Sequence, residues 1–98
     1  MEQLVKITSE NTARIFSIYP KKGVLSPGSD ADIVIVDPNR EWVLGVESLK
    51  GASDFTPWEG TRVKGKAIKT FVRGRLVAED GHLVSDSPSG QFVEPILI

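Results

Sequence analysis

The spacing of hydrophobic and polar residues predicts helix at the start of the chain and strands after it. Within residues 2–16, apolar side chains can line one helical face in the first half and another in the second half. Thr8 and Ser9 are residue types that favour helix N-caps, so two short helices with a break near Ser9 are expected. The residue before a proline avoids helical backbone, so Tyr19-Pro20 should close this region. Such a segment is typical of a helix that docks on a core.

From residue 23 onward the pattern changes to short apolar runs separated by turn residues. Residues 33–36 (Ile-Val-Ile-Val) form a continuous β-branched run, which is typical of a strand buried on both faces. A turn at Pro27-Gly28 precedes this run. Asp37-Pro38 is expected to end the strand.

The second half of the sequence predicts an antiparallel meander. Glycine accepts a positive φ, so Arg73-Gly74 and Asp80-Gly81 are expected to form two-residue hairpin turns. The predicted fold class is mainly β, with antiparallel strands following an N-terminal helix. Strands or extended segments are expected over residues 41–44, 62–66, 68–72, 75–79 and 82–85, and residues 48–60 should be irregular.

The composition narrows the possible functions. The chain has 98 residues, the size of one domain, and its net charge of −1 argues against a dedicated nucleic-acid or acidic-membrane binder. It has no cysteine, which excludes disulfides and thiolate chemistry, and its one histidine, His82, cannot form a histidine cluster. No apolar run is long enough to span a membrane, and the N-terminus lacks the apolar core of a signal peptide. A cytoplasmic location is therefore expected.

Three aspartates bracket the apolar run and raise the question of a metal or acid–base site. Asp30 and Asp32 point the same way on a strand, and paired carboxylates can hold a hard metal ion or divide acid and base roles. The alternative is that they hydrogen-bond to the backbone of the Pro27-Gly28 turn. Asp37 would lie about 17 Å from Asp32 at roughly 3.3 Å per residue, too far to join them through the strand. The structural role is the favoured interpretation.

Other chemistry-bearing residues also have a structural explanation. His82 follows a hairpin turn, where side chains are usually exposed and lack an orienting partner. Trp42 and Trp58 can stack on a ligand, but tryptophans in small domains more often anchor a core or an interface. We predict no catalytic, metal-binding or substrate-binding residue in this chain. A group of basic residues can contact nucleic acid but is more typical of a solvated strand face; it comprises Arg62, Lys64, Lys66, Lys69, Arg73 and Arg75.

A series of short motifs occurs in a defined order along nearly the whole chain. The series resembles the C-terminal region of cyclic amidohydrolases, the group of dihydroorotases, allantoinases and hydantoinases (dihydropyrimidinases). No single motif is specific, and the ordered series carries the resemblance. The motifs are NTARIF (11–16), YPKKG (19–23), GSDADIVIVDP (28–38), TPWEG (56–60), VKG (63–65), TFVRG (70–74) and GQF (90–92).

The resemblance implies a composite β-sandwich beside a metal-bearing (β/α)₈ barrel. A barrel alone takes about 250 residues, so this chain is expected to contain none. Residues 1–19 would be the helical exit from the barrel, and residues 20–98 the C-terminal portion of the sandwich. The family's zinc ligands lie on barrel strands, and none of the matched motifs carries them. We therefore transfer no site residue and expect no cofactor in this chain.

Three functional hypotheses follow, and the nature of the cyclic amide stays open. In the first, the chain is the non-catalytic C-terminal portion of an enzyme that uses zinc to hydrolyse a cyclic amide C–N bond. Its partners would be the missing barrel and N-terminal strands. In the second, it is an autonomous β module for protein association without enzymatic activity. The third and weaker hypothesis is a nucleic-acid binder that uses the basic strand. Because the net charge is −1, neither nucleic acid nor a membrane is expected as a partner.

A sandwich portion without its N-terminal strands should expose a strand edge and the apolar face of its helix. Exposed edges and apolar patches favour association. The isolated chain is therefore expected either to form a homo-oligomer or to cover the gap with its apolar tail, residues 96–98.

Overall fold

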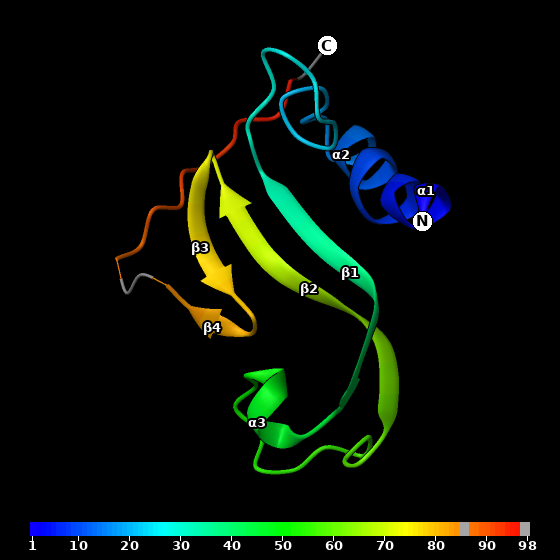
Figure 1. Ribbon diagram of the computed structural model, residues 1–98. Coiled ribbons are helices and arrows are strands. Elements are labelled where there is room, and N and C mark those ends of the chain that lie inside the picture. Colours follow the sequence, from blue (N-terminus) through cyan, green and yellow to red (C-terminus); the bar gives the residue numbers. More distant parts are fainter. Residues whose placement is uncertain (85–86, 97–98) are drawn as a thin grey trace.

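The computed structural model describes residues 1–84 and 87–96, which form an N-terminal helical segment and one antiparallel sheet (Figure 1). The sheet order follows the chain, so each strand pairs with the next. The predicted fold class, mainly antiparallel β with an N-terminal helix, is confirmed. The strands are β1 (Ile33–Val43), β2 (Arg62–Val72), β3 (Arg75–Glu79) and β4 (His82–Leu83).

The helical segment is continuous, and the predicted break near Ser9 is wrong. The Thr8 hydroxyl does not cap a new helix; it donates to the Leu4 carbonyl one turn earlier, at 2.8 Å. A hydroxyl that bonds back in this way leaves the helix intact. The helix instead widens into a π-helical turn over residues 6–10 and continues as an α-helix. It ends before Pro20, as predicted. The parts are α1 (Glu2–Val5), η1 (Lys6–Glu10) and α2 (Asn11–Ile15).

Strand β1 does not end at Asp37-Pro38, as predicted, but runs on to Val43 and absorbs the separately predicted strand over residues 41–44. The register between β1 and β2 shifts between Asp37 and Glu41. Proline is tolerated there because β1 lies at the sheet edge and the irregularity removes the need for a ladder hydrogen bond. Asp37 Oδ1 also accepts a hydrogen bond from the Asn39 amide at 2.9 Å. The strand therefore bends locally and continues.

The predicted burial of residues 33–36 on both faces is also wrong in this structure. Val34, Ile35 and Val36 are 55%, 42% and 41% exposed. β1 is an outer strand, and no described helix or second sheet packs against it. Ala13, in the helical segment, is the only described residue that is essentially buried. The apolar run therefore has the composition of a covered strand without a cover.

The rest of the sheet agrees more closely with the sequence. β2 joins the predicted segments 62–66 and 68–72 into one strand. Both predicted hairpin turns are confirmed, with positive φ at Arg73 and Gly74 (+46° and +79°) and at Asp80 and Gly81 (+50° and +83°). β4 is shorter than the predicted strand over residues 82–85, whose last residue lies outside the described range.

Between β1 and β2 the chain forms a projecting loop, the arm, residues 44–61, which contains the unpredicted helix α3 (Val46–Leu49) (Figure 1). The Ser48 hydroxyl accepts a hydrogen bond from the Gly45 amide at 3.0 Å, and Glu59 Oε2 accepts one from the Val46 amide at 2.9 Å. These side chains satisfy amides at the start of the helix that have no partner within it. Glu59 lies far along the loop, so this turn of helix depends on how the loop closes.

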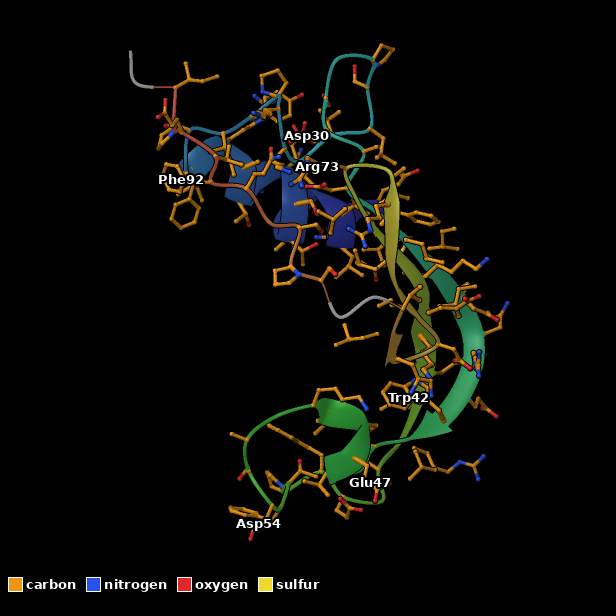
Figure 2. All side chains as sticks on the ribbon, turned by 90° about the vertical axis from the view of Figure 1, so that its left-hand side faces the viewer. Asp30, Trp42, Glu47, Asp54, Arg73 and Phe92 are labelled. Carbon is orange, nitrogen blue, oxygen red and sulfur yellow. The ribbon has the colours of Figure 1, made fainter. Side chains whose placement is uncertain are left out.

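The helical segment, the arm and the C-terminal tail, residues 87–96, all extend to the same side of the sheet (Figure 2). In the described ranges, no helix is both long and apolar enough to cross a membrane.

Candidate functional site

The two aspartates that open β1 surround a lysine ammonium group. Lys22 Nζ lies 2.9 Å from Asp30 Oδ2 and also forms an ion pair with Asp32 Oδ2. The other oxygen of Asp32 accepts a hydrogen bond from the backbone amide of Arg73 at 2.9 Å. We call this group, Lys22 with Asp30, Asp32 and the Arg73 amide, the clamp; Figure 2 shows Asp30 and Arg73 at the same end of the sheet.

The titration of the clamp follows from these contacts. Burial opposes charge on Lys22, but the hydrogen bonds to Asp32 and Asp30 outweigh it and raise the pKa of Lys22. Burial likewise would raise the pKa of Asp32, but the hydrogen bonds from Lys22 and the Arg73 amide lower it below its ordinary value. Both shifts favour the charged forms. The clamp is therefore an ion pair at neutral pH.

The favoured structural role of the aspartates is supported, but with a different partner from the one predicted. Asp32 hydrogen-bonds to the turn between β2 and β3, 41 residues away, and not to the Pro27-Gly28 turn. Sequence reasoning also missed Lys22. The available signal was a lysine pair, Lys21-Lys22, followed after one turn by two carboxylates.

The clamp does not fit the zinc site that the resemblance implies for the whole enzyme. Among the described residues, no group of three or more His, Cys, Asp or Glu side chains could hold a metal ion. Zinc also prefers nitrogen and sulfur ligands, whereas the clamp offers carboxylate oxygens around a lysine cation. We derive no step of a hydrolytic reaction from these residues.

The histidine and tryptophan candidates have separate positions. His82 is exposed on β4, opposite Glu79 on β3. Trp42 is partly buried, and its indole donates to the Gly65 carbonyl at 2.9 Å, so it anchors the pairing of β1 with β2. Trp58 lies on the arm and is 60% exposed. The structure therefore brings none of these side chains together with another or with the clamp.

Basic side chains along β2 face carboxylates on neighbouring segments. Lys66 Nζ lies 3.1 Å from Asp80 Oδ1. The pKa of Asp80 is lowered mainly by the hydrogen bond from Lys66 and, as the next largest cause, by the hydrogen bond from Arg40. Two looser pairs join neighbouring strands: Lys69 with Glu79 at 3.7 Å and Arg62 with Glu41 at 3.9 Å. The cross-strand pairing offsets part of the positive charge that a nucleic-acid surface would need.

The helical segment exposes a large apolar surface. Leu4 and Ile7 in its first half are 56% and 58% exposed, and Ile15 and Phe16 at its end are 78% and 64% exposed. Large apolar side chains that are exposed in several places along one short segment are typical of an interaction surface. With the uncovered edge of β1, this surface is the strongest candidate for a binding function.

The tail runs past the end of the helical segment and leaves that apolar surface open. The Ile96 amide donates to the Ser17 carbonyl at 2.7 Å, and the Arg73 guanidinium hydrogen-bonds to the Ser89 carbonyl. Ile96 itself is exposed, and the other residues expected to cover the gap, 97 and 98, lie outside the described range. Within the described residues, the tail therefore ties to the loop after α2 and does not seal the helix.

Known proteins resemble this chain in sequence. The profile of the Amidohydrolase family matches residues 1–77. D-phenylhydantoinase from Escherichia coli UTI89 is 37% identical over 93 residues, which cover 95% of this chain and 20% of the relative. D-phenylhydantoinase from E. coli O127:H6 is 37% identical over 92 residues, covering 94% of this chain and 20% of the relative. The chain thus spans about a fifth of the length of the curated relatives that it matches.

Solved structures give the same relationship. The structure of D-hydantoinase from Bacillus sp. AR9 is 39% identical in sequence, with a TM-score of 0.87. The match covers 95% of this chain and 20% of the D-hydantoinase chain. Dihydropyrimidinase from Brevibacillus agri NCHU1002 has 38% identity and a TM-score of 0.80, over 86% of this chain and 18% of its own. The arrangement of helical segment and sheet is therefore one that much longer chains contain.

Proposed function

Because the chain belongs to the amidohydrolase family, we propose that it is the non-catalytic C-terminal portion of a cyclic amidohydrolase. In this proposal it completes the β-sandwich that supports the catalytic barrel. The whole enzyme hydrolyses a cyclic amide C–N bond with zinc held by the barrel. The chain spans about a fifth of its curated relatives, which supports a role for it as one part of such an assembly.

The observation that carries this proposal is the apolar surface that the chain leaves uncovered. The helical segment and β1 expose aliphatic side chains of the kind that proteins bury. Each Leu, Ile, Val or Phe side chain that becomes fully buried contributes roughly 1.5–3 kcal/mol. The outer edge of β1 also carries backbone groups that another strand can pair. A barrel against the helix and further sandwich strands beside β1 would cover both surfaces.

The names of the relatives narrow the substrate class of the proposed enzyme. They are D-phenylhydantoinases, D-hydantoinases and a dihydropyrimidinase. We therefore propose that the substrate is a hydantoin or a dihydropyrimidine. Allantoin and dihydroorotate carry the same two rings with a ureido or a carboxylate substituent, and the names of these relatives do not point to either.

A second candidate function is an autonomous β module for protein association. The same exposed surfaces favour it, because a chain without a barrel partner would cover them with another copy of itself. In sedimentation at several concentrations, the isolated chain should then form oligomers, and a clean monomer at all concentrations would contradict this second candidate.

Co-expression tests the first proposal. The chain is tagged and co-expressed with D-hydantoinase from Bacillus sp. AR9 from which the matching fifth has been removed. We expect the two to purify together in equal amounts. Ile15→Asp should prevent this, whereas Leu83→Asp, at a side chain of the same 78% exposure on β4, should not.

The chain alone, supplied with zinc, should show no hydrolysis of hydantoin or dihydrouracil. Measurable turnover by the chain alone would contradict the non-catalytic role. Failure of the wild-type chain to purify with the remainder of the hydantoinase would contradict its role as part of the assembly.

A further inference from the structure

The arm carries apolar surface that the rest of the chain does not cover. Phe55 is 70% exposed and Trp58 60% exposed. With Leu49 and Val46 they line a hollow of about 300 Å³. Among the described elements, none packs against α3. Exposed aromatic side chains around a recess are typical of the centre of a protein interface.

The arm is held in shape by its own hydrogen bonds. At its base, the Leu44 amide donates to the Thr61 carbonyl and the Gly60 amide to the Leu44 carbonyl, both at 2.9 Å. Also near the base, the Thr61 amide donates to the Trp58 carbonyl at 2.9 Å, and the Glu59 amide donates to the Thr56 carbonyl at 3.2 Å. A surface that is already ordered loses less conformational entropy when it binds. The backbone that carries Trp58, one wall of the hollow, is therefore ordered before a partner binds.

The charges on the arm, at residues next in sequence to those that line the hollow, favour a basic partner. Glu47 and Asp54 are exposed carboxylates on the arm, one on α3 and one beside Phe55 (Figure 2). Glu59 adds a third, and Lys50 is the only basic residue in residues 44–61. Opposite charges around an apolar contact steer association and fix its register.

The position of the arm indicates what covers it. Figure 2 shows the arm and the helical segment on the same side of the sheet, at opposite ends. A body large enough to span the sheet on that side can contact both the helical segment and the arm. In the proposed function that body is the barrel.

We propose that the arm is a second docking site for the barrel portion, separate from the helical segment. The hollow takes an apolar side chain from a surface segment of the barrel, and Lys or Arg residues beside that side chain face Glu47 and Asp54. This inference rests on the proposed function.

The test uses the co-expressed complex of this chain with the shortened D-hydantoinase. The purified complex is diluted, and its Kd is read from the fraction dissociated at low and high salt. Trp58→Ser should weaken the complex at least about tenfold, a loss expected for a buried aromatic anchor. Glu47→Lys with Asp54→Lys should weaken it at low salt and reduce its salt dependence. Leu83→Ser, at an even more exposed apolar side chain on β4, should leave the Kd unchanged.

The thermal midpoint of each isolated variant shows whether the substitution merely damages the fold. Because Trp58 is exposed in the isolated chain, Trp58→Ser should shift the midpoint by no more than about 2–4 °C. If that variant does not fold, Phe55→Ser and the double charge reversal decide.

The outcomes separate the two proposals. A wild-type complex that arm variants weaken as stated supports the inference. A wild-type complex that arm variants bind equally well overturns the inference and leaves the proposed function standing. Absence of a wild-type complex overturns the proposed function, and the inference with it.

Discussion

The two ends of the sheet are held together in different ways. At the start of β1, the clamp joins Lys22, Asp30 and Asp32 to the backbone of Arg73, which comes from a distant hairpin. The arm at the other end is closed by hydrogen bonds within residues 44–61. A substitution in the clamp should therefore weaken the whole fold, whereas one in the arm should act locally.

Asp32→Ala should have the largest effect on stability. It removes an ion-pair partner of Lys22 and leaves the Arg73 amide without its acceptor. Hydrogen bonds to charged groups contribute about 1.5–3 kcal/mol, and partial solvent screening reduces the expected loss to about 1–2 kcal/mol. Urea unfolding measures this loss.

Asp37→Ala is the matched control, since it removes one local hydrogen bond to Asn39 and should cost about 0.5 kcal/mol. Equal losses for the two variants would contradict the special role of the clamp. Zinc affinity, measured by calorimetry, should be the same in wild type and Asp32→Ala. Loss of zinc binding in Asp32→Ala would show that the aspartates are a metal site after all.

The pH dependence of stability should reveal the same ion pair. The pKa of Asp32 is lowered in the folded state, so its contribution is present above its unfolded pKa of about 4 and is lost as pH falls through the lower folded value. The pKa of Lys22 is raised, so its contribution is complete below its unfolded pKa of about 10.4 and is lost as pH rises through the higher folded value.

Urea unfolding from pH 2 to 7 checks the acid side of this expectation. The difference in free energy of unfolding between wild type and Asp32→Ala should be constant near neutral pH and should shrink below about pH 4. The difference between variants removes the contribution of other carboxylates, including Asp80. A difference that stays constant down to pH 2 would contradict the ion pair.

In the arm, Glu59→Ala should act locally. It removes the acceptor of the Val46 amide and should cost about 0.5–1 kcal/mol within the arm. Hydrogen exchange at residues 44–61 should become faster, while exchange in β2 and β3 stays as it was. Glu47→Ala, at an exposed carboxylate of the same arm, serves as the control. Faster exchange across the whole sheet would show that the arm and the clamp are not independent.

The smallest effect is expected at an exposed cross-strand pair. Lys69→Met removes the 3.7 Å ion pair with Glu79, and exposed pairs of this kind contribute about 0–1 kcal/mol. Urea unfolding in low and high salt should show a small loss that salt removes. A loss as large as that of Asp32→Ala would erase the distinction between the clamp and ordinary surface pairs.

Features that depend on neighbouring residues were predictable from the sequence. The turns at Arg73-Gly74 and Asp80-Gly81 form where predicted, because a two-residue hairpin needs positive φ and glycine supplies it. The prediction of a helix break near Ser9 was wrong because the Thr8 hydroxyl can either cap a new helix or donate to a carbonyl of the preceding turn, and it does the second. Helix α3 was missed because its first amide depends on Glu59, at the far side of the loop.

The burial of residues 33–36 shows a different limit. The Ile-Val-Ile-Val composition is that of a strand covered on both faces, yet no described element of this chain supplies the cover. The structural role of Asp30 and Asp32 was predictable, whereas Lys22 and Arg73 as their partners were not. Which lysine and which amide a carboxylate meets depends on the path of the whole chain.

Hydrolysis by the reassembled enzyme is the most direct test of the central claim. The chain, the shortened Bacillus sp. AR9 D-hydantoinase and their co-expressed complex are each assayed with hydantoin at equal concentrations. We predict hydrolysis by the complex only, and its loss when the chain carries Ile15→Asp. A complex that forms but stays as inactive as its parts, or a chain that hydrolyses hydantoin alone, would contradict the account.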